Sequence, residues 1–231
     1  MTQFPLAYLP SVDLLQAYRV PLAHARLAST PEESAVAAEE IGYPVALKAV
    51  SQEFAHKSEA GLVSLDLVDA AQVETAAGEL VRKARCEASS GVRLEGLLVQ
   101  EMVRSGVEMI VGVNTDPQFG PILLLGAGGI WVELLEDVVL RLPPLTHNQA
   151  LSMISEIRAS KLLQGYRGAP VADIPALQYL LVQVGQLALE QQDRIETMDL
   201  NPVMVLPAGQ GVKVVDFRVY PRQQGLSENF E

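Results

Sequence analysis

Two side chains near the C-terminus, Asn201 and Asp216, carry oxygen donors inside apolar runs that a short turn joins. The sequence 207–210, Pro-Ala-Gly-Gln, is typical of the turn of a β-hairpin. A turn centred between Ala208 and Gly209 makes Asn201 and Asp216 direct cross-strand neighbours, with Cβ atoms ~5 Å apart. The spacing therefore predicts an amide oxygen and a carboxylate side by side.

Strand alternation places Asp216 on the same face as Val212 and Val214. A carboxylate there needs a partner, because burying an unpaired charge costs several kcal/mol. Two hard oxygen donors suit a divalent cation, and Mg²⁺ typically takes one or two protein ligands together with phosphate oxygens. The hairpin is therefore the expected floor of a nucleotide site.

Three charged residues interrupt runs that are otherwise apolar: Lys48 in 44–50, Glu108 in 107–113 and Arg141 in 138–142. Lys48 lies either on an edge strand, with its amine in solvent, or points at phosphate oxygens as a compact charge. The carboxylate of Glu108, expected to be buried, either forms a structural salt bridge or accepts hydrogen bonds from ribose hydroxyls. Arg141 is a further cation in an apolar strand.

Two backbone segments suit a nucleotide. Residues Gln100, Glu101, Met102 and Val103 end a strand before a glycine turn, where a C=O and an N–H can meet an adenine edge. The segment 126–129, with Gly126, Gly128 and Gly129, follows a strand as phosphate-binding loops do, although glycines also occur in any tight turn. It matches neither a P-loop nor a G-x-G-x-x-G fingerprint.

His56 lies in a polar loop directly after the Lys48 strand. An imidazole beside a phosphate-binding lysine can accept a phosphoryl group covalently, and the alternative is a solvent-exposed histidine without a role. The sequence shows no Ser-His-Asp set, no cysteine nucleophile and no metal-binding histidine pair.

The bulk properties narrow the class of protein. The chain has 231 residues, 49% of them hydrophobic, which suffices for one large or two small domains. The net charge of -11 argues against nucleic acid or an anionic membrane as a general partner. With one cysteine, Cys86, no intramolecular disulfide forms, and we expect a cytoplasmic protein without a signal peptide.

Strand and helix patterns alternate along the chain, and hairpins mixed with helices predict an α+β fold. A capping box at Thr30–Glu33 predicts a helix to about Ile41. We expect two lobes, an N-terminal one over 1–93 and a C-terminal one over 94–231. Helices are expected at 11–18, 69–88, 146–158 and 173–192, and strands at 22–28, 44–50, 62–67, 94–103, 107–113, 121–125 and 138–142.

These segments together resemble the ATP-grasp domain of NDP-forming acyl-CoA synthetases, that is, the β subunit of ADP-forming acetyl-CoA synthetase and its fused bacterial relatives. The resemblance covers the chain from Leu14 to about Tyr220. It rests on the sequence segments Ile41–Lys48, His56–Ser58, Leu98–Gln100, Asp116–Pro121, Gly126–Ile130 with Val132, Glu133 and Asp137, Gly165–Gly168, and Asp199–Pro202.

The resemblance implies two lobes that sandwich ATP or ADP. It assigns phosphate binding to Lys48, the adenine hinge to 100–103 and ribose binding to Glu108. Asn201 and Asp216 would bind Mg²⁺, and Arg141 with the 126–129 loop would stabilise the transferring phosphoryl group, since such catalysis is mainly positioning and charge stabilisation.

The reaction implied is the reversible conversion of acyl-CoA, ADP and phosphate to carboxylic acid, CoA and ATP, through an acyl phosphate and a phosphohistidine. The main phosphohistidine and the CoA site belong to a partner α subunit or domain that this chain lacks. His56 matches the histidine of a family loop that relays the phosphoryl group. Here Glu59 replaces the usual aspartate, and Leu62 replaces the second glycine of a pair.

The resemblance leaves a second function open. The same domain is fused to acetyltransferases in some bacterial proteins, where it would act as a regulatory nucleotide-binding module without turnover. A stand-alone ATP-grasp ligase is less favoured, because the matching motifs belong to the CoA-ligase branch.

Overall fold

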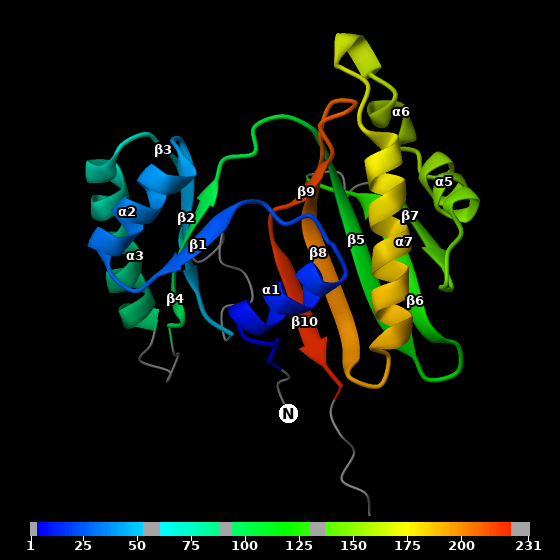
Figure 1. Cartoon of the computed structure of the whole chain (residues 1–231), viewed down its shortest axis with the longest axis horizontal. Helices are drawn as coiled ribbons and strands as arrows, with labels where there is room; N and C mark the ends of the chain where they lie inside the picture. The colour runs from blue at the N-terminus through cyan, green and yellow to red at the C-terminus, as the bar shows by residue number, and fades with distance from the viewer. Residues whose placement is uncertain (1–3, 53–60, 88–93, 130–136, 223–231) are drawn as a thin grey trace, which may run out of the picture.

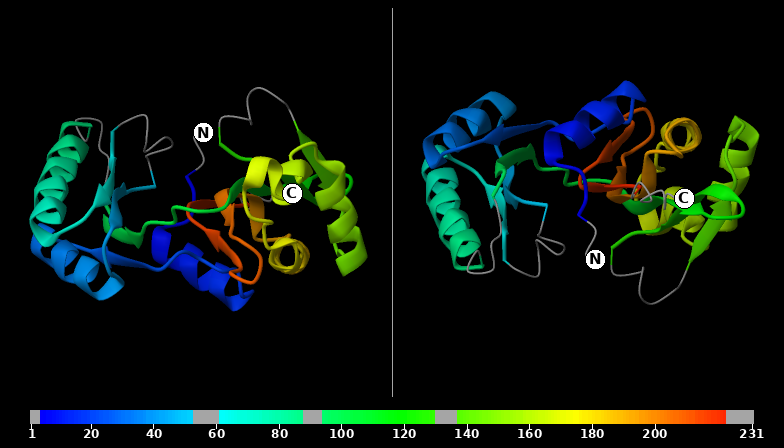
Figure 2. Two further views of the ribbon diagram at one scale, coloured as in Figure 1. Left: turned by 90° about the horizontal axis from the view of Figure 1, so that it is seen from above. Right: turned by 90° about the horizontal axis from the view of Figure 1, so that it is seen from below.

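The chain folds into two lobes, each built on an antiparallel sheet. The structure is a computed structural model that describes residues 4–52, 61–87, 94–129 and 137–222 (Figure 1). Views from above and below show the lobes side by side with the N-terminal helix beside the junction (Figure 2). The α+β fold predicted from the sequence is confirmed. No helix within these residues is both long and apolar enough to cross a membrane.

The small lobe is a four-stranded antiparallel sheet in the order β1-β4-β2-β3, covered by two helices. Its helices pack on the sheet through a core that includes Leu47, Leu80 and Val99. The elements are β1 (Ala25–Ala28), α2 (Pro31–Ile41), β2 (Val45–Val50), β3 (Val63–Leu67), α3 (Ala70–Glu87) and β4 (Gly96–Glu101).

The N-cap predicted at the start of α2 is confirmed, but the glutamate expected to complete a capping box bonds the residue before the N-cap. The Thr30 side chain accepts a hydrogen bond from the N–H of Glu33, and the Glu33 carboxylate accepts one from the N–H of Ser29. Pro31 takes the first helical position, where a missing N–H costs nothing. This helix therefore begins and ends where its sequence predicts.

The large lobe is a six-stranded sheet in the order β10-β8-β5-β6-β7, with β9 paired to β8. Helices α5 and α7 cover one face of this sheet, and the core between them includes Leu125, Met153 and Val184. The elements are α1 (Tyr8–Ala17), β5 (Val107–Asp116), β6 (Gly120–Ala127), β7 (Val138–Arg141), α5 (His147–Glu156), α6 (Ser160–Leu163), the 3-10 helix Tyr166–Gly168, α7 (Ile174–Glu190), β8 (Ile195–Val205), β9 (Val212–Val214) and β10 (Phe217–Pro221).

The lobes divide later in the sequence than the expected boundary at 93/94. Strand β4 pairs with both β1 and β2, so it belongs to the small sheet, and the chain passes to the large sheet between Glu101 and Val107. The N-terminal helix belongs to the large lobe, because Leu15 lies in that core. Burial of Leu97 and Val99 under the small-lobe helices accounts for the place of β4.

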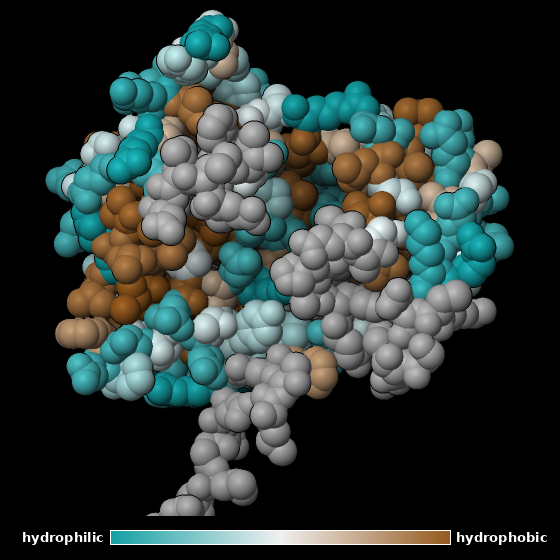
Figure 3. All heavy atoms as spheres, turned by 180° about the vertical axis from the view of Figure 1, so that it is seen from behind, coloured by the Kyte–Doolittle hydropathy of each residue, from teal (hydrophilic) through white to brown (hydrophobic). Residues whose placement is uncertain are grey.

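The edge strand β7 of the large sheet carries exposed apolar side chains. Seen from behind, apolar side chains gather on the large lobe (Figure 3). Val138, Leu140 and Leu142, in and directly after the edge strand β7, are each at least half exposed. This edge of the sheet is therefore apolar on its outer face.

Candidate functional site

A cleft of about 540 Å³ lies between the two sheets. It is bounded by β2 and β3 of the small lobe, by the connection after β4 and by the C-terminal hairpin of the large lobe. Most of the residues selected from the sequence meet in it. They are Lys48, Gln100, Glu101, Met102, Val103, Glu108, Asn201 and Asp216.

The register predicted for the C-terminal hairpin is confirmed. Val203 pairs with Val214, and Leu200 pairs with Phe217, so the same register holds on both sides of the proposed site. Between these pairs the N–H of Asn201 donates to the carbonyl of Asp216 at 3.0 Å. The two oxygen donors are therefore cross-strand neighbours at the cleft.

The face predicted for Asp216 is wrong. Val212 and Val214 are buried in the large core, whereas Asp216 lines the cleft. The strand alternation breaks between Val214 and Asp216, and β8 shows a register shift against β5 between Leu200 and Val203, opposite this break. A bulge of this kind adds a residue on one strand and re-aims its side chains. The irregularity brings Asp216 out of the core.

Lys48 lies on an interior strand, which excludes the edge-strand alternative. Its strand β2 is hydrogen-bonded to β4 on one side and β3 on the other, and the residue is 7% exposed. The ammonium donates to the carbonyl oxygen of Val215 at 3.1 Å. The cation is thus held at the cleft beside the hairpin that carries Asp216.

The connection after β4 offers one clear backbone donor. The N–H of Met102 donates to Pro44, which leaves the N–H of Val103, for which the described residues supply no partner. The Glu101 side chain accepts from Lys213 and from the N–H of His24. Its carboxylate therefore serves the contact between the lobes.

Gln100 contributes a buried polar group to the cleft. Its amide nitrogen donates to Val215 at 3.0 Å. Its amide oxygen is buried and has no hydrogen-bond partner among the described residues. Leaving such an acceptor unpaired costs ~1–3 kcal/mol, which a hydrogen-bond donor on a ligand or water would recover.

Glu108 is exposed, so the expectation of a buried carboxylate is wrong. Its neighbours Met109, Val111 and Val113 alternate into the core, and Glu108 points the other way. It lines the edge of the cleft and an adjoining hollow of about 410 Å³. This position leaves its carboxylate accessible to a ligand.

The glycine segment packs against Glu108. Gly126 lies within β6, paired with Ile110 and Val138, so the loop begins later than predicted. The N–H of Gly128 donates to the Glu108 carbonyl at 2.8 Å, and Gly129 has φ +64°. A Cβ on Gly129 would lie 2.8 Å from the Glu108 carboxylate. Glycine is therefore required here by backbone conformation and by close approach.

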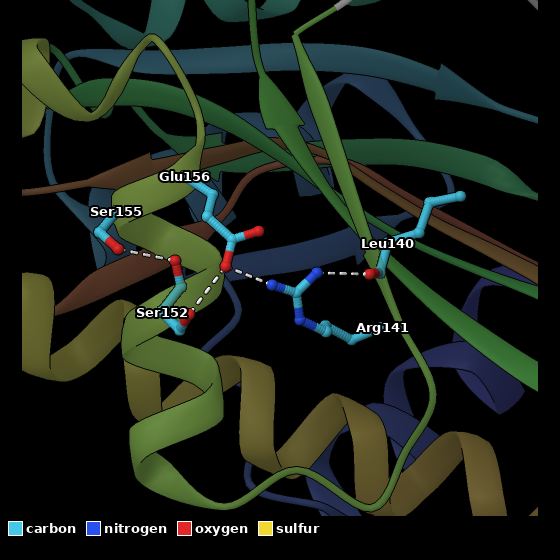
Figure 4. A network of polar contacts seen from close by, with 5 residues as sticks. All are labelled: Leu140, Arg141, Ser152, Ser155 and Glu156. Atoms are coloured by element: carbon cyan, nitrogen blue, oxygen red, sulfur yellow. Dashed lines mark hydrogen bonds and ion pairs between the residues drawn. The ribbon is translucent and has the colours of Figure 1, made fainter.

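Among the described residues, Arg141 and the three selected glycines do not line the cleft, although Gly128 and Gly129 line the adjoining hollow. Arg141 forms an ion pair with Glu156 of α5, which also accepts from Ser152 (Figure 4). The Arg141 guanidinium and the Ser152 hydroxyl lower the pKa of Glu156. His56 lies outside the described residues.

Asp199 lines the cleft but was given no role from the sequence, although it opens the segment Asp199–Pro202. It pairs across strands with Arg218, another lining residue without an assigned role. Burial raises the pKa of Asp199; Arg218 opposes the rise and Asp216 adds to it. Two neighbouring carboxylates, those of Asp199 and Asp216, thus line the cleft.

The geometry described above has known counterparts. The family model of the ATP-grasp domain matches residues 5–220. This chain belongs to the ATP-grasp family. It is 41% identical to the β subunit of acetate–CoA ligase (ADP-forming) II from Pyrococcus furiosus, over 90% of this chain and 87% of that protein.

Longer relatives and solved structures agree with this assignment. The chain is 39% identical to 4-hydroxybutyrate–CoA ligase (ADP-forming) of Nitrosopumilus maritimus, but spans 29% of the length of that protein. Acetyl-coenzyme A synthetase 1 of Ca. Korarchaeum cryptofilum, solved with coenzyme A and Ca-AMPCP, superposes with a TM-score of 0.89 at 40% identity. That match covers 95% of this ATP-grasp chain and 94% of the solved one.

Proposed function

We propose that this chain is the nucleotide-binding component of an NDP-forming acyl-CoA synthetase. It would transfer a phosphoryl group between ATP or ADP and a histidine, while a CoA-binding α subunit or domain completes the reaction of a carboxylic acid with CoA. The observation that carries the proposal is the convergence of Lys48, Asn201 and Asp216 on one cleft between two antiparallel sheets.

The donor set fits a magnesium nucleotide. Asn201 and Asp216 supply two hard oxygen donors, and Mg²⁺ prefers few protein ligands when phosphates supply the rest. The described residues contain no group of three or more His, Cys, Asp or Glu that could hold a metal without a nucleotide. A bound Mg²⁺ would neutralise charge on the phosphates.

The remaining roles follow from position. The buried ammonium of Lys48 would bind phosphate oxygens, the free N–H of Val103 would meet the adenine, and the accessible Glu108 would accept from the ribose. Gly128 holds the Glu108 carbonyl through its N–H, and Gly129 leaves room for the Glu108 carboxylate because it has no Cβ. Arg141 and His56 stay proposals for the transfer step itself.

The partner and the acid are proposed from the relatives. Pyrococcus furiosus proteins similar to this chain are named as β subunits, which implies an α subunit for them. The Korarchaeum enzyme was also solved with Mg-AMPPCP and its phosphohistidine segment pointing towards the nucleotide site. Relatives are named for acetate, 4-hydroxybutyrate and trans-ferulate, so we infer that the acid is selected outside this cleft.

The test is reconstitution. The purified chain is mixed with the CoA-binding subunit of its own organism, ATP, Mg²⁺ and a series of carboxylic acids, and ADP and acyl-CoA are measured together. We expect both products in equal amounts. ATP binding without either product, across the series, would contradict the proposal and favour a regulatory module. His56→Ala should abolish turnover but retain ATP binding, with His147→Ala as the control.

A further inference from the structure

The residues just before the first helix bridge the two lobes. The N–H of Leu6 donates to the carbonyl of Val219 in β10 at 2.7 Å. The amide of Gln52, from the small lobe, donates to the carbonyl of Pro5 at 3.0 Å. The N–H of Tyr8 donates to the carboxylate of Glu95 at 2.9 Å. Residues 5–8, termed the N-terminal strap, therefore contact both lobes at once.

The strap ends in an aromatic stack on the large lobe. The Tyr8 ring lies over that of Phe217, with centroids 5.5 Å apart and planes inclined by 21°. A small hollow of about 30 Å³ lies between the strap, the end of β2 and the start of β10. Burial and the charge of Asp216 raise the pKa of Tyr8 to about 12, so its hydroxyl stays neutral at physiological pH. The stack is close-packed.

Phe217 in turn contacts the oxygen donors of the cleft. Its N–H donates to the Asp216 carboxylate at 2.9 Å, and its backbone pairs with Leu200, the neighbour of Asn201. The N–H of Asn201 donates to the Asp216 carbonyl. A displacement of the Phe217 backbone would therefore move both donors, because hydrogen bonds link it to Asp216 and to the strand of Asn201.

The strap also reaches the strand that carries Lys48. Gln52 follows β2 directly, and β2 holds the buried ammonium at the cleft. Contacts of the strap thus connect the phosphate-binding strand with the hairpin of Asn201 and Asp216. Tyr8 is not among the residues that line the cleft, so we expect no contact between Tyr8 and the nucleotide.

We propose that Tyr8 is a positioning residue: stacked on Phe217, it fixes the orientation of Asp216 and Asn201 relative to the Lys48 strand, and so sets the affinity for the magnesium form of the nucleotide. This inference rests on the function proposed above. Tyr8 does not line the cleft, whereas Phe217 does, so Tyr8 would act through Phe217. Loss of the stack should therefore weaken the binding of ATP in the presence of Mg²⁺ more than the binding of ATP without it.

The experiment compares ATP affinities of the purified chain by calorimetry, in Mg²⁺ and in excess EDTA. Tyr8→Leu keeps most of the side-chain volume but removes the aromatic face, and should weaken binding in Mg²⁺ about three- to tenfold, with less than about a twofold change in EDTA. Tyr8→Phe, which keeps the ring, should restore most of the affinity. Tyr179→Leu, on the outer side of α7, is the matched control.

Two outcomes for Tyr8→Leu would overturn the positioning role. Equal weakening of ATP binding in Mg²⁺ and in EDTA would show that the strap supports the cleft as a whole. Unchanged ATP affinity under both conditions would show that the stack has no effect on binding. If Tyr8→Leu does not fold, Phe217→Leu removes the other ring, and the Mn²⁺ electron paramagnetic resonance line width of its nucleotide complex must then differ from wild type. Wild-type protein that fails to bind magnesium ATP contradicts the proposed function itself.

Discussion

Lys48 and Gln100, from neighbouring strands of the small sheet, donate hydrogen bonds to the same carbonyl oxygen, that of Val215. The acceptor belongs to the large lobe, next to Asp216, and its own N–H donates to the carbonyl of Pro202. One residue, Val215, thus joins the small sheet to both strands of the hairpin through its C=O and its N–H. The Lys48 ammonium is oriented before any phosphate arrives, which lowers the entropy cost of binding one.

Replacing this ammonium should weaken nucleotide binding strongly. Lys48→Met keeps the apolar stem but removes a charge-assisted contact worth ~1.5–3 kcal/mol, so we expect roughly ten- to hundredfold weaker ATP binding in calorimetry. Lys83→Met, on α3 and bonded to Gly61, should have no effect. Equal affinities in the two variants would remove Lys48 from the phosphate site.

The oxygen donors should determine the response to magnesium. Asp216→Asn and Asn201→Ala should each reduce the gain in ATP affinity on adding Mg²⁺ by about tenfold or more, because a small site loses one of two protein ligands. Asp116→Asn is the control, since that carboxylate only caps a turn. Unchanged magnesium dependence in Asp216→Asn would show that this carboxylate does not bind the metal.

The contact between Glu101 and Lys213 should make stability depend on pH. Burial raises the pKa of Glu101, but hydrogen bonds from Lys213 and the His24 N–H outweigh it, and the pKa lies below the ordinary 4.5. Because the pKa of Glu101 is lower in the folded chain than in the unfolded chain, the contact stabilises the fold at pH values above the unfolded-state pKa. This stabilisation is lost as the pH falls through the folded-state pKa.

Lys213→Met should therefore destabilise the protein at neutral pH by up to about 1 kcal/mol, because the pair is partly exposed, and should flatten the loss of stability on acidification. Urea unfolding at a series of pH values measures this, with Lys161→Met, on α6, as the control. A variant with the pH profile of wild type would mean that the pair contributes nothing to stability.

Arg141 should affect transfer and leave nucleotide binding unchanged, because it does not line the cleft. We expect Arg141→Ala to lower turnover of the reconstituted enzyme at least about tenfold with ATP affinity intact. Glu156→Gln, which breaks the ion pair but keeps Arg141, should change turnover by less than about threefold. Arg82→Ala, on α3, controls for loss of surface charge. Full activity in Arg141→Ala would leave the residue only the structural contact of Figure 4.

Asp173 should be a major contributor to the stability of the large lobe. This buried carboxylate accepts from the N–H of Ala176, at the start of α7, and from the N–H of Gly211, in the hairpin turn. Asp173→Ala should lower the free energy of unfolding by about 2–4 kcal/mol, since a helix cap and a buried acceptor are lost together. Asp69→Ala removes an exposed carboxylate that bonds Gln72, and should cost only about 0.5–1 kcal/mol. Similar losses in both variants would contradict the structural role of Asp173.

Local signals predicted local structure well in this chain. The Thr30 N-cap of α2 and the hairpin register depend on residues close in sequence, and both are confirmed. The face of Asp216 could not be read in this way, because the bulge that re-aims it arises where β8 pairs with β5, far earlier in the chain. The exposure of Glu108 was readable, since Met109, Val111 and Val113 alternate on the opposite face.

Contacts between residues that are distant in sequence account for the other differences between the predicted and the observed structure. Strands β4 and β5 follow each other with a short connection that is typical of a hairpin, yet they lie in separate sheets because β4 pairs with β1 and β2. The ion pair of Arg141 with Glu156 could not be predicted from the sequence, because it depends on the packing of α5 beside β7. The charge of Arg141 was evident, but its position relative to the cleft was not.

The division of the lobes has a consequence for how the protein is made. The small sheet uses only strands within residues 25–101, whereas the large lobe combines the N-terminal helix with the described elements from β5 to β10. During synthesis the small lobe can therefore complete its sheet while the N-terminal helix still waits for its partners. Leu6 and Leu22 meet theirs, Val219 and Val214, only when the last strands emerge from the ribosome. We therefore expect the cleft between the two lobes to assemble late, because it requires closure of this long loop.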